Sequence, residues 1–163
     1  MIIKTNHPLL LLFLVILPAV VFSQDKALLI EKMAQGADLI FTGKVIDQNS
    51  VWNKDKTRIY TNVTIQVEEY LKGENSDRTI VVTHPGGEIG NVGELYTHIP
   101  TFQNKEEVLL FVKKNLRDKN FEVFQGENGK LSLIEDKGTG EKRTTQNWRV
   151  DRLKEEIKLS LKN

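Results

Sequence analysis

The chain has 163 residues, with 23 Lys and Arg against 22 Asp and Glu, and a formal net charge of +1. This balance argues against attraction of the whole surface to nucleic acid or to an anionic membrane. The sequence contains no cysteine, which excludes disulfide scaffolds, thiol catalysis, iron–sulfur clusters and cysteine-ligated zinc.

The N-terminal residues have the pattern of an export signal. Lys4 precedes an almost unbroken apolar run over residues 9–21. The run is shorter than the roughly 20 residues that a membrane-spanning helix needs, and its length is typical of the apolar region of a secretory signal peptide. A buried N-terminal helix is the alternative, and Pro18 disfavours it because proline removes a backbone donor inside a helix.

Small or medium side chains at Val21 and Ser23 predict cleavage between Ser23 and Gln24. We therefore expect a signal peptide over residues 1–23. The mature chain, residues 24–163, is expected to fold as a single domain in the periplasm or outside the cell. No second long apolar stretch follows, so we expect no transmembrane anchor.

The first half of the mature chain predicts a short helix and two long strands. Gln24–Ala37 has apolar residues at helical spacing, and Gly36 can end the helix. Leu39–Val51 predicts a strand in which Gly43 marks a bend or a close backbone approach. Arg58–Leu71 alternates most clearly, and its break at Glu68 and Glu69 predicts a β-bulge. The inward row is Ile59, Val63, Ile65 and Val67, and the outward row is Tyr60, Asn62, Thr64 and Gln66.

The second half predicts shorter strands and a final helix. Thr79–His84 predicts a strand with Ile80 and Val82 inward, and Glu107–Lys113 predicts a strand buried on both faces. Five further segments are expected: a loop over Pro85–Gly93, an edge strand over Glu94–Ile99, a hairpin of Phe121–Phe124 with Lys130–Ile134, and an amphipathic helix over Thr145–Leu161. Thr144 or Thr145 is expected to cap that helix, and Val150, Leu153, Ile157 and Leu161 form its apolar stripe.

Short turns between strands predict antiparallel pairing, because parallel strands need a crossover of a dozen residues or more. We therefore expect a mainly β fold: a small antiparallel β-barrel, closed or partly open, with a short N-terminal helix and a C-terminal amphipathic helix.

Two segments, residues 37–45 and 60–73, resemble the netrin-like OB-fold group, whose best-known members are the tissue inhibitors of metalloproteinases. The first reads ADLIFTGKV and the second ends in LKG. Residues 83–93 and 108–112 also look like exported bacterial proteins without an assigned activity. The resemblance implies that the expected barrel is OB-like. It does not imply a function, because one fold hosts many functions. The metalloproteinase inhibitors chelate zinc through an N-terminal cysteine, which this chain lacks, so none of their inhibitory residues is carried over.

The glycine-rich run Pro85–Gly93 is the most unusual stretch. Glycines let a backbone approach a ligand or adopt positive φ, so His84, Gly86, Gly87 and Glu88 are candidate binding residues. A metal site built from His84, His98 and a carboxylate, Glu88 or Glu94, is the chemical alternative, although zinc needs three or four converging ligands. A plain connection that needs glycines to turn is the structural alternative.

The outward row of the second strand offers a different surface. Tyr60, with Trp52 nearby, could stack on a sugar or a base in the manner of an OB-type face. Lys44, Lys54, Lys56 and Arg58 could hold an anion. The aromatic content is only 7%, which favours a solvated sheet face and makes a nucleic-acid partner unexpected.

Two functional hypotheses remain. The first is an exported, non-catalytic binding module that engages a protein, such as a protease, or a glycan. The absence of H-E-x-x-H, G-x-S-x-G and P-loop patterns favours it, and no cofactor or bound metal is expected with it. The second is a metal-dependent hydrolase centred on the His84–His98 region.

Overall fold

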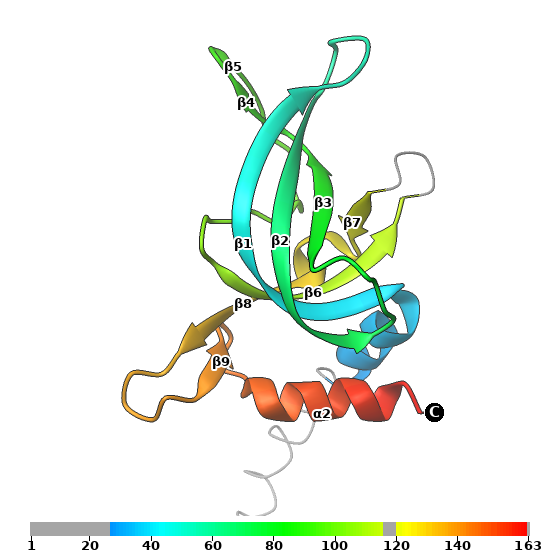
Figure 1. The fold of residues 1–163 in the computed structure, drawn as a ribbon, viewed down its shortest axis with the longest axis vertical. Helices are drawn as coiled ribbons and strands as arrows, with labels where there is room; N and C mark the ends of the chain where they lie inside the picture. The colour runs from blue at the N-terminus through cyan, green and yellow to red at the C-terminus, as the bar shows by residue number, and fades with distance from the viewer. Residues whose placement is uncertain (1–26, 116–119, 163) are drawn as a thin grey trace, which may run out of the picture.

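The structure is a computed structural model that describes residues 27–115 and 120–162. The predicted signal peptide and its cleavage site lie outside the described residues, as does the beginning of the predicted first helix. The described part is mainly β, with a closed barrel of five strands, a short helix at residues 27–36 and a C-terminal helix (Figure 1).

The barrel strands run in the order β1-β2-β3-β7-β6, and β6 pairs back with β1 to close the ring. Their bounds are β1 (Leu39–Trp52), β2 (Ile59–Lys72), β3 (Thr79–Pro85), β6 (Glu107–Lys114) and β7 (Phe121–Val123). Every pairing is antiparallel except β3 with β7, where Val82 lies opposite Phe121 on a parallel strand. The OB-like barrel predicted from the sequence is confirmed. The long connection between β3 and β7 makes this parallel pairing possible.

The first strand bends where the sequence predicts. A Cβ atom on Gly43 would lie 2.5 Å from the carbonyl oxygen of Gln66, so only glycine lets the two backbones come this close. The pairing of β1 with β2 also passes over Glu68, because Thr42 pairs with Glu69 while Gly43 pairs with Val67. This is the predicted β-bulge. The first part of β1, Leu39–Lys44, also pairs with β6.

The alternating side chains of β6 separate two hydrophobic cores, which explains the continuous apolar run in this strand. Val108, Leu110 and Val112 point into the barrel, where Val63, Ile65, Ile80 and Val82 also lie. Leu109 and Phe111 point outward, against the two helices. The helices contribute Ile30, Met33, Ala34, Val150, Leu153 and Ile157 to this outer core. The apolar stripe of the C-terminal helix therefore covers the outer side of the sheet.

The predicted hairpin between Phe121 and Ile134 is wrong. Both β7 and β8 (Lys130–Glu135) pair with β6, and they occupy successive parts of the same edge. The short 3-10 helix η1 (Gly126–Gly129) joins them. The glycines do turn the chain, but one edge of β6 is long enough for its backbone groups to pair with β8 over Glu107–Leu110 and with β7 over Val112–Lys114.

The glycine-rich run is a second correction. It forms a two-stranded hairpin of β4 (Gly87–Ile89) and β5 (Val92–Glu94), with Gly90 and Asn91 at the turn. The predicted strand over Glu94–Ile99 is absent, since the chain after β5 is irregular. The hairpin projects from the barrel at the end that also carries the β1–β2 turn, while the C-terminal helix lies at the other end (Figure 1).

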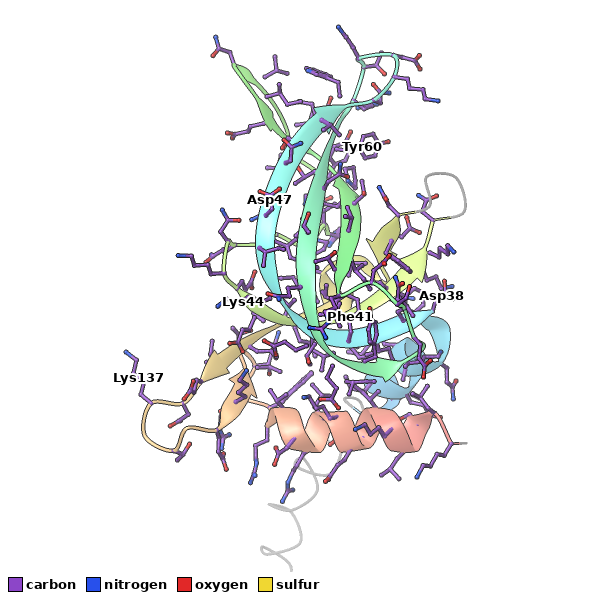
Figure 2. The ribbon with its side chains drawn as sticks, in the orientation of Figure 1. Asp38, Phe41, Lys44, Asp47, Tyr60 and Lys137 are labelled. Atoms are coloured by element: carbon purple, nitrogen blue, oxygen red, sulfur yellow. The ribbon has the colours of Figure 1, made fainter. Side chains whose placement is uncertain are left out.

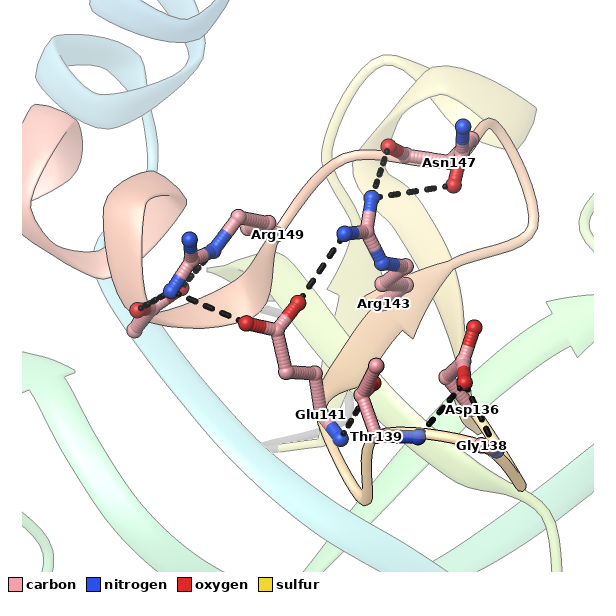
Figure 3. A network of polar contacts seen from close by, with 8 residues as sticks. Asp136, Gly138, Thr139, Glu141, Arg143, Asn147 and Arg149 are labelled. Atoms are coloured by element: carbon pink, nitrogen blue, oxygen red, sulfur yellow. Dashed lines mark hydrogen bonds and ion pairs between the residues drawn. The ribbon is translucent and has the colours of Figure 1, made fainter.

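The C-terminal helix α2 (Val150–Ser160) begins later than predicted and has no side-chain cap. Thr144 instead accepts a hydrogen bond from the Trp148 backbone N–H at 3.2 Å, within the turn that precedes the helix. Glu141, next to β9 (Lys142–Thr144), forms ion pairs with Arg143 and Arg149 (Figure 3). These ion pairs connect the β8–β9 hairpin to the start of the helix.

Candidate functional site

A surface pocket of about 350 Å³ lies where β3 ends and the β4–β5 hairpin leaves the barrel. The end of β3, both strands of the hairpin and the irregular segment after β5 form its walls. Its lining residues are His84, Pro85, Gly86, Gly87, Glu88, Gly93, Glu94, Leu95, Tyr96, Ile99, Pro100 and Thr101. This volume lies near the lower end of the range found for small-ligand pockets in proteins. We call this feature the hairpin pocket.

Close packing against β1 and β2 holds the base of the hairpin. The Thr61 hydroxyl donates a hydrogen bond of 2.7 Å to the carbonyl oxygen of Gly86. Gly87 has φ of +136°, and a Cβ atom on it would lie 2.4 Å from Thr61 Oγ1 and 2.5 Å from Ser50 Oγ. Only glycine fits both the conformation and the space. The sequence signal of clustered glycines is therefore explained by a tight exit from the barrel.

Two rings stand in the walls of the hairpin pocket. The half-buried ring of His84 stacks on Phe102 at a centroid distance of 6.0 Å, and its Nδ1 lies 3.0 Å from the carbonyl oxygen of Pro85. The Tyr96 hydroxyl donates to the Glu94 carboxylate at 3.0 Å and accepts from the Arg58 guanidinium at 3.1 Å. These contacts fix both rings before any ligand arrives.

The rim of the hairpin pocket carries an exposed apolar side chain. Leu95, one of the lining residues, has 95% of its surface exposed. Glu88, another lining residue, is also exposed, and it has no hydrogen-bond or ion-pair partner among the described residues. The rim therefore offers an apolar contact and a free carboxylate at the mouth of one pocket.

The structure brings together four of the six binding residues predicted from the sequence. His84, Gly86, Gly87 and Glu88 line the hairpin pocket. The other two, Trp52 and Tyr60, are not among its lining residues. Tyr60 on β2 pairs with Pro85 on β3, and Figure 2 shows Tyr60 toward the hairpin end of the barrel.

Sequence reasoning did not select Leu95 and Tyr96 as site residues. The only signal was their position directly after the glycine-rich run, in a segment read as an edge strand. This segment is irregular, and the Leu95 side chain lies in solvent. A strand would have given Leu95 a pairing partner.

The two histidines of the metal hypothesis lie in different surroundings. His98 has 91% of its side chain exposed and lies 4.0 Å from a carboxylate oxygen of Glu127, whereas His84 packs on Phe102. No group of three or more His, Asp or Glu side chains able to hold a metal ion occurs within residues 27–115 and 120–162.

The four basic residues predicted to contact an anion lie in two separate parts of the barrel. Lys44 lies within β1, opposite Gln66 and Glu107, and Figure 2 shows it farther from the hairpin end than Tyr60. Lys54, Lys56 and Arg58 lie at the β1–β2 turn. Of the four, Arg58 reaches the hairpin pocket, through its hydrogen bond to Tyr96.

No protein-family model matches the chain, and no curated protein matches it in sequence. Among the described residues, no helix has the length and apolar character needed to cross a membrane. The geometry of the hairpin pocket is therefore the basis for a functional assignment.

Proposed function

We propose that this protein is an exported, non-catalytic binding module of the netrin-like OB-fold type, which engages a protein or glycan partner at the hairpin pocket. The observation that carries the proposal is the rim of this pocket, where Leu95 stands 95% exposed over a cavity with aromatic and proline walls. Exposed apolar groups beside a preformed pocket are typical of interaction sites.

The rigidity of the pocket supports the same function. The hydrogen bond of Thr61 to Gly86 and the two hydrogen bonds of Tyr96 hold the walls in place. A partner that binds a preformed site loses less free energy to ordering the protein. The site also lies on a projecting hairpin, so a large partner can approach it without contacting the rest of the barrel (Figure 1).

The test is capture of a partner by the protein expressed from its full-length sequence and purified as the host processes it. Native exported proteins and a glycan array provide the candidate ligands, and a panel of proteases tests for inhibition. Leu95→Ser removes the apolar rim without disturbing the core, because the side chain is almost wholly in solvent.

Leu159→Ser on α2 is the matched control, since Leu159 is also exposed, at 61%, and lies at the other end of the molecule. We expect Leu95→Ser to weaken capture about tenfold or more, as for a central apolar contact, and Leu159→Ser to leave it unchanged. A partner captured equally by both variants would show that the hairpin pocket is not the binding site.

A further inference from the structure

The hairpin pocket is lined by two carboxylate side chains and by the imidazole of His84. Glu88 and Glu94 contribute carboxylates, and no Lys or Arg is among the lining residues. Arg58 reaches the edge of the pocket, where it donates to the Tyr96 hydroxyl, and this hydroxyl in turn donates to Glu94. Arg58 thus offsets part of the charge of Glu94, and Glu88 keeps an uncompensated negative charge at the mouth.

Several of the other lining residues are apolar. Pro85, Ile99 and Pro100 line the cavity together with Tyr96. A pocket with an apolar wall and a carboxylate at its rim matches one kind of side chain, a long aliphatic stem that ends in a cation. Lys and Arg bury such stems along apolar surface while the charged head stays at the water boundary. Tyr96 also lines the pocket, and an aromatic ring attracts a cation placed over its face.

Resting on the proposed function, we infer that the hairpin pocket takes a Lys or Arg side chain of a protein partner. The aliphatic stem of this side chain lies along Pro85 and Tyr96, and its cationic head pairs with Glu88. Leu95 packs against the partner residues that flank the Lys or Arg. The partner is accordingly a protein with an exposed basic residue, and a glycan, which carries no such cation in its common neutral forms, is the competing outcome of the test.

The experiment follows backbone amide shifts by NMR in the purified protein while a short peptide is added. The probe is acetyl-Gly-Arg-Gly-amide. Its matched control carries citrulline in place of arginine, which keeps the shape and removes the charge. We expect shifts confined to residues 84–101, and affinity about three- to fivefold weaker for the citrulline peptide, the size expected of one solvent-facing charge pair.

The variant Glu88→Gln should remove this preference for arginine. Glu122→Gln is the control, because Glu122 is an exposed carboxylate on β7 outside the hairpin pocket, and it should keep the preference. Equal affinity for the two peptides, an arginine preference that survives Glu88→Gln, or no shift of residues 84–101 with the arginine peptide would each overturn the inference.

Failure of this inference is distinguishable from failure of the proposed function. If chitotriose shifts residues 84–101 and the arginine peptide does not, the pocket binds a glycan, and the binding module stands while the cationic partner is refuted. If capture of the partner does not depend on Leu95, the proposed site itself is wrong, whatever the peptides do.

Discussion

Glu106 offers the sharpest test of how the irregular segment that joins the hairpin pocket to β6 is held. Its Oε1 accepts from Lys130 Nζ at 2.7 Å and from Ser132 Oγ at 2.6 Å, and its Oε2 accepts from the Gln103 backbone N–H at 2.9 Å. The side chains of Lys130 and Glu106 are only 10% and 14% exposed. The Lys130 ammonium also lies 5.0 Å from the ring centroid of Phe102, which stacks on His84 in the pocket wall.

The perturbation is Glu106→Gln, which keeps the shape and removes the charge. An exposed ion pair contributes about 0–1 kcal/mol, and loss of one partner from a buried pair costs about 3–5 kcal/mol. Because this pair lies between these limits, we expect the free energy of unfolding to fall by about 2 kcal/mol. In a domain of this size that corresponds to a loss of about 6 °C in Tm.

The matched control is Glu107→Gln in the next residue of the chain. Glu107 pairs with Lys142, and these two side chains are 34% and 43% exposed. Solvent screens this pair, so its loss should cost about 0.5 kcal/mol or less. Urea unfolding followed by circular dichroism measures both. Equal losses in the two variants would refute the reasoning that burial makes the Glu106 pair stronger.

The same residue predicts a pH dependence. Burial by itself raises the pKa of Glu106, but the hydrogen bonds from Lys130, Ser132 and the Gln103 N–H outweigh it and leave this pKa below its ordinary value. A carboxyl group with a lowered folded-state pKa stabilises the fold fully above its unfolded pKa of about 4.3. This contribution disappears as the pH falls through the lowered pKa. The difference in stability between the protein and Glu106→Gln should therefore be constant near neutral pH and shrink in acid.

Three further predictions concern the N-terminus, the hairpin and the first helix. Intact mass spectrometry of the protein exported by a bacterial host should find a chain that begins at Gln24, and an uncut chain would contradict the signal peptide. Gly87→Ala should destabilise the fold by about 1–3 kcal/mol, because its Cβ would meet Thr61 and Ser50. Gly90→Ala, with φ of +61° but open space around it, should cost about 1 kcal/mol, and equal losses in urea unfolding would count against the close contact. Lys72→Met should speed amide exchange in residues 27–36, because the Lys72 ammonium donates to three carbonyl oxygens at the end of that helix; unchanged exchange there would show that these bonds do not hold the helix end.

The strongest predictions from the sequence concern local periodicity. The alternation of β2 placed Ile59, Val63 and Ile65 inward, and all three are fully buried. The continuous apolar run of β6 predicted burial on both faces, which the two cores confirm. Such patterns show which face of a helix or strand is buried, and the spacing of apolar residues within that one element is enough to predict it.

The hairpin pocket shows the limit of the same reasoning. The glycine cluster marked its floor, and His84 and Glu88 followed from their position beside it. Tyr96 was missed because its contact with Arg58 spans 38 residues of sequence, and no local pattern records such a pair.

The sequence by itself determined the strands β1, β2, β3 and β6, the two flanking helices and the barrel class, because apolar spacing along an element is set by residues that are close together in the chain. Only the tertiary structure decided that β7 and β8 both pair with β6, and that the glycine run is a projecting hairpin. The pairing of β7 and β8 depends on the edge of β6 that is left free because its other edge pairs with β1. The place where the hairpin leaves the barrel depends on its packing against β1 and β2. The pocket exists at the place where β3, the hairpin and the segment that follows it meet.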